Sequence, residues 1–239
     1  MTDFSGIAVA IPAHQEAATI DRALVAVLGA ARAPHPVVVV VAADSCTDGT
    51  AGVVRRRARV VPAHVEVHVL ELRARSAGVA RQAACVAADA RLQALVGATS
   101  ARWIATTDAD STVPVDWFDN HRRWVRRGAD AVAGLVRVDP RSPLPPSVWR
   151  HVDAEFARAG FGHRHVYGAN LGVTAAWWAA AGGFPAVETG EDERFVARLR
   201  AAGASVVSIT DAPVLTSGRL AGRAPAGFGA HLAGLALEA

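Results

Sequence analysis

The stretch WIATTDADSTVP, Trp103 to Pro114, joins a short apolar strand to two aspartates. Asp108 and Asp110 follow the strand directly and are separated by one residue. The chain contains 14 aspartates, and random order would produce about one such pair. The pair alone therefore does not distinguish a cation site from an ordinary loop, and the segments around it must decide.

The composition is that of a globular protein with a sizeable core. The 239 residues are 51% hydrophobic and 20% charged, which excludes a disordered chain. The longest apolar run, Val37–Ala43, is too short to span a bilayer, and MTDFSG does not resemble a secretory signal. With only Cys46 and Cys85, no disulfide framework is expected. We expect a cytoplasmic protein without stable membrane insertion, and transient membrane association remains open.

All 25 basic residues are arginines, and the net charge is +3. The lack of lysine excludes a Schiff base, a lysine nucleophile and a P-loop lysine. Two arginine clusters, Arg55–Arg59 and Arg122–Arg127, could face nucleic acid, anionic lipid or a phosphorylated substrate. Solvated helix faces explain them better, and we expect no nucleic-acid partner.

Strands and helices alternate along the first half of the chain. Apolar strands are predicted at Ile7–Ile11, Val37–Ala43, Val65–Leu72 and Trp103–Ala105, with amphipathic helices between them. Pro12 is expected to end the central ladder of the first strand, and Thr47 or Asp48 to cap the second helix. Ser76 is the expected cap of the third helix. The alternation predicts an α/β fold with parallel strands and right-handed crossovers.

Acidic loops follow three of these strands, at Ala13–Glu16, Asp44–Asp48 and Asp108–Ser111. In parallel sheets the ligand lies beyond the carboxyl ends of the strands. The three loops are therefore expected to converge on one site, which gives the aspartate pair a functional context.

The second half is less regular. It is predicted to hold a strand within Gly128–Pro140, a proline-rich connection over Arg141–Trp149, a turn, strand and short helix within His165–Phe184, and a helix from Gly190 to Gly203 followed by another strand. No repeat or low-complexity linker separates the halves, so we expect a single domain over residues 1–239.

Seven segments together resemble glycosyltransferase family 2. In order they are IPAHQEAATI, DSCTDGT, GVARQAA, TTDADS, GANLGV, GGF and GEDERFVARLRAAG, and the resemblance extends from Ile7 to Arg223. It implies a GT-A fold, with a Rossmann-like, mainly parallel sheet flanked by helices. A nucleotide-sugar-binding half, residues 1–112, would share one domain with an acceptor-binding half, residues 113–239, that carries a C-terminal lid segment.

The same resemblance implies a metal-dependent glycosyltransferase, with inversion as the favoured outcome and retention left open because the fold supports both. The donor would be a UDP-, GDP- or dTDP-sugar and the acceptor a hydroxyl of unknown identity. The implied donor-binding residues are Pro12, Ala13, Glu16, Asp44, Gly78, Arg81, Asp108 and Ala109. The first loop, Pro12–Glu16, is expected to expose backbone amides to the nucleoside, although it could be an ordinary turn in which the helix dipole favours Glu16. Ala43 replaces an acid common in the family, which leaves the base open.

Asp110, with Asp108, is the implied metal ligand. Carboxylate oxygens and a diphosphate suit Mg²⁺ or Mn²⁺. The metal would neutralise the departing nucleoside diphosphate. Asp48 and Thr50 are expected to have only a structural role.

Three acids begin a helix at Glu191, Asp192 and Glu193. By themselves they indicate capping, because the helix dipole favours acids there. The resemblance makes Asp192 the catalytic base, with Glu191 as the second choice.

Further residues are implied on the acceptor side. Gly168 and Asn170 would shape the sugar or acceptor site, and Ser217, Arg219 and Arg223 would close over the diphosphate as a lid. Trp177 and Trp178 could stack on sugars, but core packing explains them better.

Other function classes fit less well. A non-catalytic sugar-nucleotide-binding protein remains possible from sequence. A sugar nucleotidyltransferase would usually carry lysines and a basic glycine-rich loop, which this chain lacks. A dinucleotide oxidoreductase is disfavoured because GFGAHLAG, Gly227 to Gly234, lacks the full glycine pattern.

Overall fold

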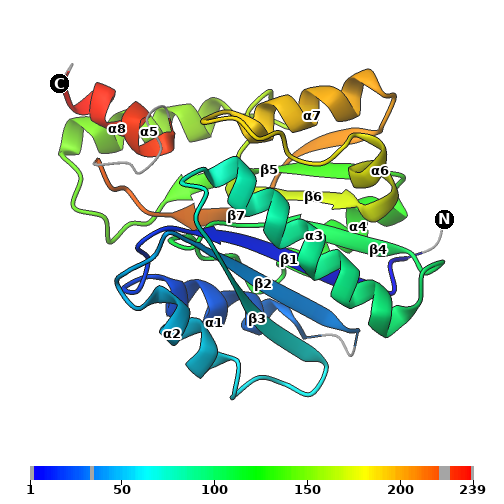
Figure 1. Ribbon diagram of the computed structural model, residues 1–239. Coiled ribbons are helices and arrows are strands. Elements are labelled where there is room, and N and C mark those ends of the chain that lie inside the picture. Colours follow the sequence, from blue (N-terminus) through cyan, green and yellow to red (C-terminus); the bar gives the residue numbers. More distant parts are fainter. Residues whose placement is uncertain (1–2, 33–34, 221–226, 238–239) are drawn as a thin grey trace.

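Seven strands form one sheet in the order β3-β2-β1-β4-β6-β5-β7 (Figure 1). The computed structural model describes residues 3–32, 35–220 and 227–237. The strands are β1 (Gly6–Ala13), β2 (Val37–Asp44), β3 (Val65–Leu72), β4 (Arg102–Thr106), β5 (Ala131–Val138), β6 (Leu171–Thr174) and β7 (Val206–Thr216). Only β6 runs antiparallel to its neighbours, β4 and β5. The predicted mainly parallel α/β sheet is confirmed.

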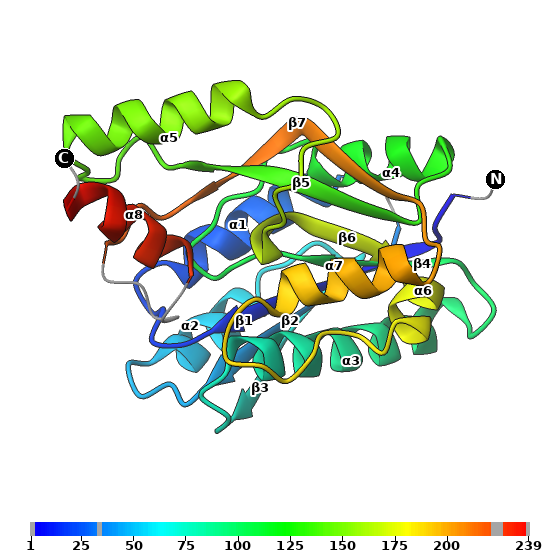
Figure 2. The ribbon, with the colours of Figure 1, turned by 90° about the horizontal axis from the view of Figure 1, so that it is seen from above.

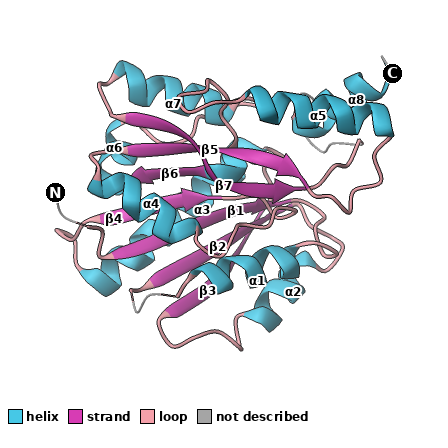
Figure 3. Cartoon of the chain, turned by 180° about the vertical axis from the view of Figure 1, so that it is seen from behind, coloured by secondary structure: helices cyan, strands magenta, loops and turns pink. Residues whose placement is uncertain are grey.

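Helices cover both faces of the sheet. One face carries α1 (Ile20–Ala30), α2 (Thr50–Arg57) and α4 (Trp117–Arg126), seen in front in Figure 3. The other carries α3 (Ala77–Val96), α6 (Ala175–Ala180) and α7 (Glu191–Ala201). Successive strand residues point to opposite faces, so Ile7, Val9 and Ile11 join the first core while Ala8 and Ala10 join the second. No helix among the described residues is long and apolar enough to cross a membrane.

Two helices that the sequence did not predict pack together beyond the end of β5. They are α5 (Pro146–Arg158) and α8 (Phe228–Leu237), side by side in Figures 1 and 2. The proline-rich connection ends at Pro145, and Pro146 begins α5 because its fixed φ suits the first helical position. Val148, Val152 and Leu232 close a small third core between the two helices.

The prediction that Pro12 ends the central ladder is wrong. β1 continues to Ala13, and Pro12 pairs with Ala42 of β2. Residues two apart on a strand face the same neighbour, and the carbonyl of Ala10 accepts from Thr107, so Pro12 faces the β4 side. The β4 pairing has already stopped at Ala10. The missing N–H of proline therefore breaks no ladder bond.

The predicted caps are close to those observed. Ser76 caps α3, where its hydroxyl accepts from the Val79 N–H at 3.3 Å. The N-cap position of α2 is Gly49, with φ of 90°, rather than Thr47 or Asp48. Asp48 still accepts from the Thr50 N–H at 3.1 Å, so the expected structural role of Asp48 and Thr50 is confirmed.

The last strand is longer than its apolar pattern suggests. The strand predicted after Gly203 is β7, which continues to Thr216 after a register shift opposite Gly134–Val136. Its end pairs with the aspartate loop, because Thr112 and Leu215 exchange two backbone hydrogen bonds. The residues that follow β7, including Arg219, therefore lie at the carboxyl edge of the sheet.

His121 lies fully buried among aromatic rings in the first core. Its Nδ1 accepts from the Trp103 indole N–H at 3.0 Å, and its ring centroid lies 5.0 Å from that of Trp117. Burial lowers the pKa of His121 from 6.5 to about 3. The folded protein therefore holds a neutral imidazole that the unfolded chain would protonate near pH 6.

We predict that His121 makes the fold acid-sensitive. Between pH 6.5 and pH 3 the unfolded state binds the extra proton, so the free energy of unfolding should fall as pH is lowered, by about 1.4 kcal/mol per unit from this group. Urea unfolding at pH 6.5 and pH 5 should show a shallower pH dependence in His121→Gln than in wild type. Replacing the exposed His151 by Gln should leave it unchanged, and equal slopes in all three proteins would contradict this role.

Candidate active site

Two acidic side chains and one arginine meet at the carboxyl edge of the sheet. The Arg219 guanidinium donates to Glu16 Oε1 at 2.8 Å and Oε2 at 3.1 Å, and to Asp110 Oδ2 at 2.5 Å. Glu16 comes from the loop after β1, Asp110 from the loop after β4, and Arg219 from the segment after β7. Two carboxylates predicted from different loops are therefore joined by one of the predicted lid residues.

A second arginine joins the aspartate loop to α7. The buried Arg81 guanidinium on α3 donates to Asp108 Oδ1 at 3.0 Å, to the Gly168 carbonyl at 2.9 Å and to Glu191 Oε1 at 3.2 Å. The Arg81 and Glu191 side chains are only 5% and 8% exposed. The Glu191 carboxylate thus neutralises the Arg81 guanidinium. Glu191 is therefore paired inside the protein rather than open to a substrate.

Asp192 is fixed by backbone groups beside this network. Its Oδ2 accepts from the Gly168 N–H at 2.7 Å and its Oδ1 from the Glu193 N–H at 2.9 Å. Thr106 holds the same segment, because its hydroxyl donates to the Gly168 carbonyl at 2.6 Å. The Asp192 carboxylate is thus oriented by short bonds.

Two predicted glycines are required by close packing. A Cβ on Gly168 would lie 2.5 Å from Arg81 Nη2, and one on Gly78 would lie 2.7 Å from the Pro185 carbonyl oxygen. Gly168 therefore lets the guanidinium of Arg81 approach the backbone. Gly78 lets the start of α3 pack against the segment that leads to α7, so the observed reason for a glycine there is packing.

The acids at the site are electrostatically crowded. Burial raises the pKa of Asp110 to about 6, helped by the charges of Asp108 and Glu16 and opposed by Arg219. Burial also raises the pKa of Asp192, while Arg81 lowers it. Such perturbed carboxyl groups, gathered at one edge of a sheet, are typical of a functional site.

The first loop differs from its prediction. Two of its amides have internal partners, because Gln15 donates to Cys46 Sγ at 3.4 Å and Glu16 to Thr50 Oγ1 at 2.9 Å; the next amide, that of Ala17, donates to Asp48 Oδ2 at 2.9 Å. The amides of Gln15 and Glu16 are therefore bound by the loop after β2 and by the start of α2. Pro12 and Ala13 lie at the end of β1, and Ala109 is buried between the two aspartates.

Asp44 also has internal partners. Its two oxygens accept from the Ala74 N–H at 2.7 Å and the Ser76 N–H at 2.9 Å, in the turn that begins α3. Burial alone would raise the pKa of Asp44, but these backbone bonds lower it. The side chain therefore positions the start of α3, and contact with a base stays a prediction.

The expected sugar contact of Asn170 is corrected by its burial. The side chain is 0% exposed, donates to the carbonyls of Leu135 and Ala212, and accepts from the Trp117 indole at 2.8 Å. Its amide is fully engaged in joining β5, β7 and α4. Asn170 is a positioning residue.

The remaining predicted residues divide between the site and the surface. Ser217 accepts from the Arg219 N–H at 3.3 Å, while Arg223 lies outside the described residues. Trp177 and Trp178 pack on the second core, as expected, in α6 at the far end of the sheet (Figure 1). The arginine clusters include residues paired with acids, as in Arg57–Asp21 and Arg126–Asp3.

Asp108 and Asp110 can bind a metal ion only if a bound ligand supplies further oxygen atoms. Within the described part of the chain no three His, Cys, Asp or Glu side chains are arranged to hold an ion. Asp108 and Asp110 offer hard oxygen donors for part of an Mg²⁺ or Mn²⁺ shell, and diphosphate and water oxygens would have to complete it. The donor chemistry fits a metal that arrives with a diphosphate.

Glycosyl transferase family 2 matches residues 8–171, more than half of the chain. The chain belongs to this family. No curated protein sequence matches it. The matched region of this family 2 protein contains Glu16, Arg81 and both loop aspartates, whereas Asp192 and Arg219 lie beyond it.

Solved structures confirm the predicted GT-A fold. S. aureus TarS 1–349 in complex with UDP-GlcNAc superposes with a TM-score of 0.68 at 14% identity, covering 93% of this chain and 61% of that one. The mannosyltransferase PcManGT from Pyrobaculum calidifontis, in complex with GDP-Man and Mn²⁺, gives 0.67 at 20% identity, covering 93% and 59%. The chain thus spans about three fifths of the length of these structures.

Sequence reasoning missed how Arg81 is used. It placed Arg81 among the donor-binding residues, but the guanidinium is buried against Asp108 and Glu191. The neighbouring residues indicate this burial, because Ala80 and Ala84 belong to a buried part of α3. An arginine buried there must be paired with acidic side chains inside the protein.

We predict that Arg81 is essential for stability. Arg81→Leu should cost about 3–5 kcal/mol of unfolding free energy, because it leaves the buried Glu191 carboxylate without its cation. Urea unfolding should show that Arg81→Leu combined with Glu191→Leu recovers part of the loss. Arg91→Leu, which removes a surface pair with Glu66, should change stability little. An Arg81 variant as stable as the Arg91 variant would contradict the proposed network.

Proposed function

We propose that this chain transfers a sugar from a nucleoside-diphosphate sugar to an acceptor hydroxyl, with inversion and with a divalent metal. The observation that carries the proposal is the network around Arg81. It links Asp108, in the donor-side loop, to Glu191, the neighbour of Asp192. Membership in family 2 supports the reaction class, and the GT-A fold supports a donor at the carboxyl edge of the sheet.

On the donor side, Asp108 and Asp110 would hold Mn²⁺ or Mg²⁺ together with the diphosphate. Bound there, the metal would neutralise charge on the departing diphosphate. Arg219, whose side chain is 34% exposed, now pairs with Glu16 and Asp110 and is the cation best situated for the phosphate oxygens. Its guanidinium can bind a phosphate in the same two-pronged way as it binds Glu16.

Asp192 would act as the base. It takes the proton of the acceptor hydroxyl, whose oxygen forms a bond to the anomeric carbon. The bond from that carbon to the diphosphate oxygen breaks, and its electron pair leaves with the nucleoside diphosphate. The N–H groups of Gly168 and Glu193 orient the carboxylate, and its partial burial raises the pKa of Asp192 and so its basicity.

The base of the donor remains a choice among uracil, guanine and thymine. UDP-GlcNAc and GDP-Man, bound by two proteins of the same fold, are the first donors to test. The acceptor residues are proposed within residues 113–239, in the same domain. As the chain spans only part of its structural neighbours, its substrates need not be theirs.

We predict that Asp192→Asn abolishes turnover and spares donor binding. Release of nucleoside diphosphate from UDP-GlcNAc or GDP-Man with Mn²⁺ should fall about 10²–10⁴-fold, because the amide cannot accept the proton. Glu193→Gln, a change at the adjacent exposed acid, is the matched control and should keep its activity. Donor affinity should be equal in all three proteins.

Two results would contradict these roles. Loss of donor binding together with turnover would make Asp192 a binding residue rather than the base. Donor binding without turnover in wild type, tested across acceptors, would favour the non-catalytic sugar-nucleotide-binding alternative.

A further inference from the structure

The loop after α5 holds an exposed aromatic ring. Phe161 is 67% exposed, and no other Phe, Trp or Tyr in the described part of the chain is exposed to this extent. It lies between Gly160 and Gly162, and Gly162 has a φ of 79°, a left-handed conformation that favours glycine. The chain therefore turns tightly next to Phe161 and leaves the ring at the surface.

Hydrogen bonds to β7 fix the position of this loop. The Gly162 N–H donates to the Ser208 carbonyl at 3.1 Å, and His163 Nε2 donates to the Ile209 carbonyl at 3.0 Å. β7 is the last strand in the sheet order, so these contacts use its otherwise open edge. Phe161 is thus exposed on a supported loop rather than on a free segment.

The ring packs against the end of α4. Its centroid lies 5.4 Å from that of Trp124 at an interplanar angle of 26°, so the two rings are stacked. Such a stack covers one face of the Phe161 ring and leaves the other face to solvent. The loop and the end of α4 therefore form one continuous surface with these two rings at its centre.

Three arginines flank the two rings. Arg127 Cζ lies 5.1 Å from the Trp124 ring centroid, whereas Arg158 and Arg164 line a hollow beside Phe161. All three arginines are exposed. Within the ranges that the structure describes, none of the three forms an ion pair. Their charges are therefore available to an anionic partner.

Nearby acids do not cancel these charges. Asp211 on β7 is paired with a further arginine of α4, Arg123. Glu155, which also lines the hollow, binds His231 Nε2 at 3.2 Å. The unpaired charges at this surface are therefore those of the arginines.

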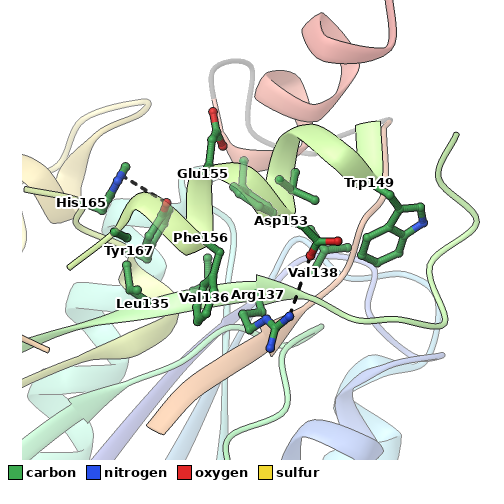
Figure 4. A pocket seen from close by; sticks show the side chains of 13 residues that line it. Leu135, Val136, Arg137, Val138, Trp149, Asp153, Glu155, Phe156, His165 and Tyr167 are labelled. Carbon is green, nitrogen blue, oxygen red and sulfur yellow. Dashed lines mark hydrogen bonds and ion pairs between the residues drawn. The ribbon is translucent and has the colours of Figure 1, made fainter. Parts of the chain in front are cut away.

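The hollow beside Phe161 has a volume of about 380 Å³ and is open to solvent. That volume lies in the range of pockets that bind small ligands. The cavity drawn in Figure 4, between α5 and β5, shares Glu155 and His165 with the hollow but has a volume of only about 40 Å³. It has room for water alone, whereas the hollow can accept a phosphate headgroup.

We propose that this surface docks reversibly on an anionic phospholipid membrane. Phe161 enters the boundary between headgroups and acyl chains, and Arg127, Arg158 and Arg164 bind headgroup phosphates. An apolar ring among arginines matches this boundary, where apolar burial and attraction to anionic lipid act together. A single-stranded nucleic acid would instead need several rings along a basic groove. The docking does not depend on the proposed sugar transfer.

Vesicle flotation tests the docking. Wild type should bind vesicles of phosphatidylcholine mixed with phosphatidylglycerol but not vesicles of phosphatidylcholine alone, and salt should weaken the binding. Arg158→Gln and Arg164→Gln should each lower the affinity about fivefold, the effect of one arginine at an anionic surface. Phe161→Ala should lower it about tenfold through lost apolar burial. Phe161→Trp should bind at least as tightly as wild type, because tryptophan favours the membrane interface.

Arg198→Gln on α7 and Val86→Ala on α3 are the matched controls. Both residues are exposed, on helices that cover the opposite face of the sheet from α4. Vesicle affinity in both variants should equal that of wild type. All the replaced side chains are exposed, so urea unfolding should be the same in every variant.

Several results would overturn the proposal. Absence of binding to the anionic vesicles, or equal losses in the control and test variants, would remove the specific surface. Displacement from vesicles by glycerol 3-phosphate would show that the hollow binds a soluble phosphate rather than a membrane. Binding of single-stranded DNA that is lost in Phe161→Ala and Arg164→Gln would show that the partner is a nucleic acid.

Discussion

The buried guanidinium of Arg81 is the constraint on which the site depends. A buried cation must be paired and hydrogen-bonded, and its partners come from distant parts of the chain: Asp108, Glu191 and the Gly168 carbonyl. Meeting that requirement brings the aspartate loop, the segment before β6 and the start of α7 to the same point. Asp192 is then oriented by Gly168, which must lack a Cβ to admit the guanidinium.

Arg219 pairs with its acidic partners in a more solvent-exposed environment than Arg81 does. Its side chain is 34% exposed, compared with 5% for Arg81, so its pairing with Glu16 and Asp110 is less shielded from solvent and from a competing ligand. In the proposed mechanism Arg81 is a permanent part of the structure, whereas Arg219 exchanges carboxylate oxygens for phosphate oxygens.

The sequence predicts this protein best where local pattern and tertiary contact agree. Short apolar runs identify β1, β2 and β4, alternation identifies β3, and the position of Asp108 and Asp110 after a strand places them at the carboxyl edge of the sheet. Sequence reasoning fails for α5 and α8, because their proline and glycine content obscures short apolar faces. It also fails for Pro12, because a proline is tolerated at this position of β1 only where the pairing with β4 has already stopped. The partners of Arg81 and Asn170 lie up to 110 residues away, so no local pattern reveals that these side chains are internally bound.

Calorimetric titration of UDP and GDP, each with and without Mn²⁺, tests most directly whether the acidic edge is a metal–diphosphate site. The proteins are wild type, Asp110→Ala and, as the control, Asp116→Ala at a neighbouring exposed acid. One nucleotide should bind wild type and Asp116→Ala only with Mn²⁺, and should not bind Asp110→Ala. Metal-independent binding, or equal binding to Asp110→Ala, would contradict the role assigned to the aspartate pair.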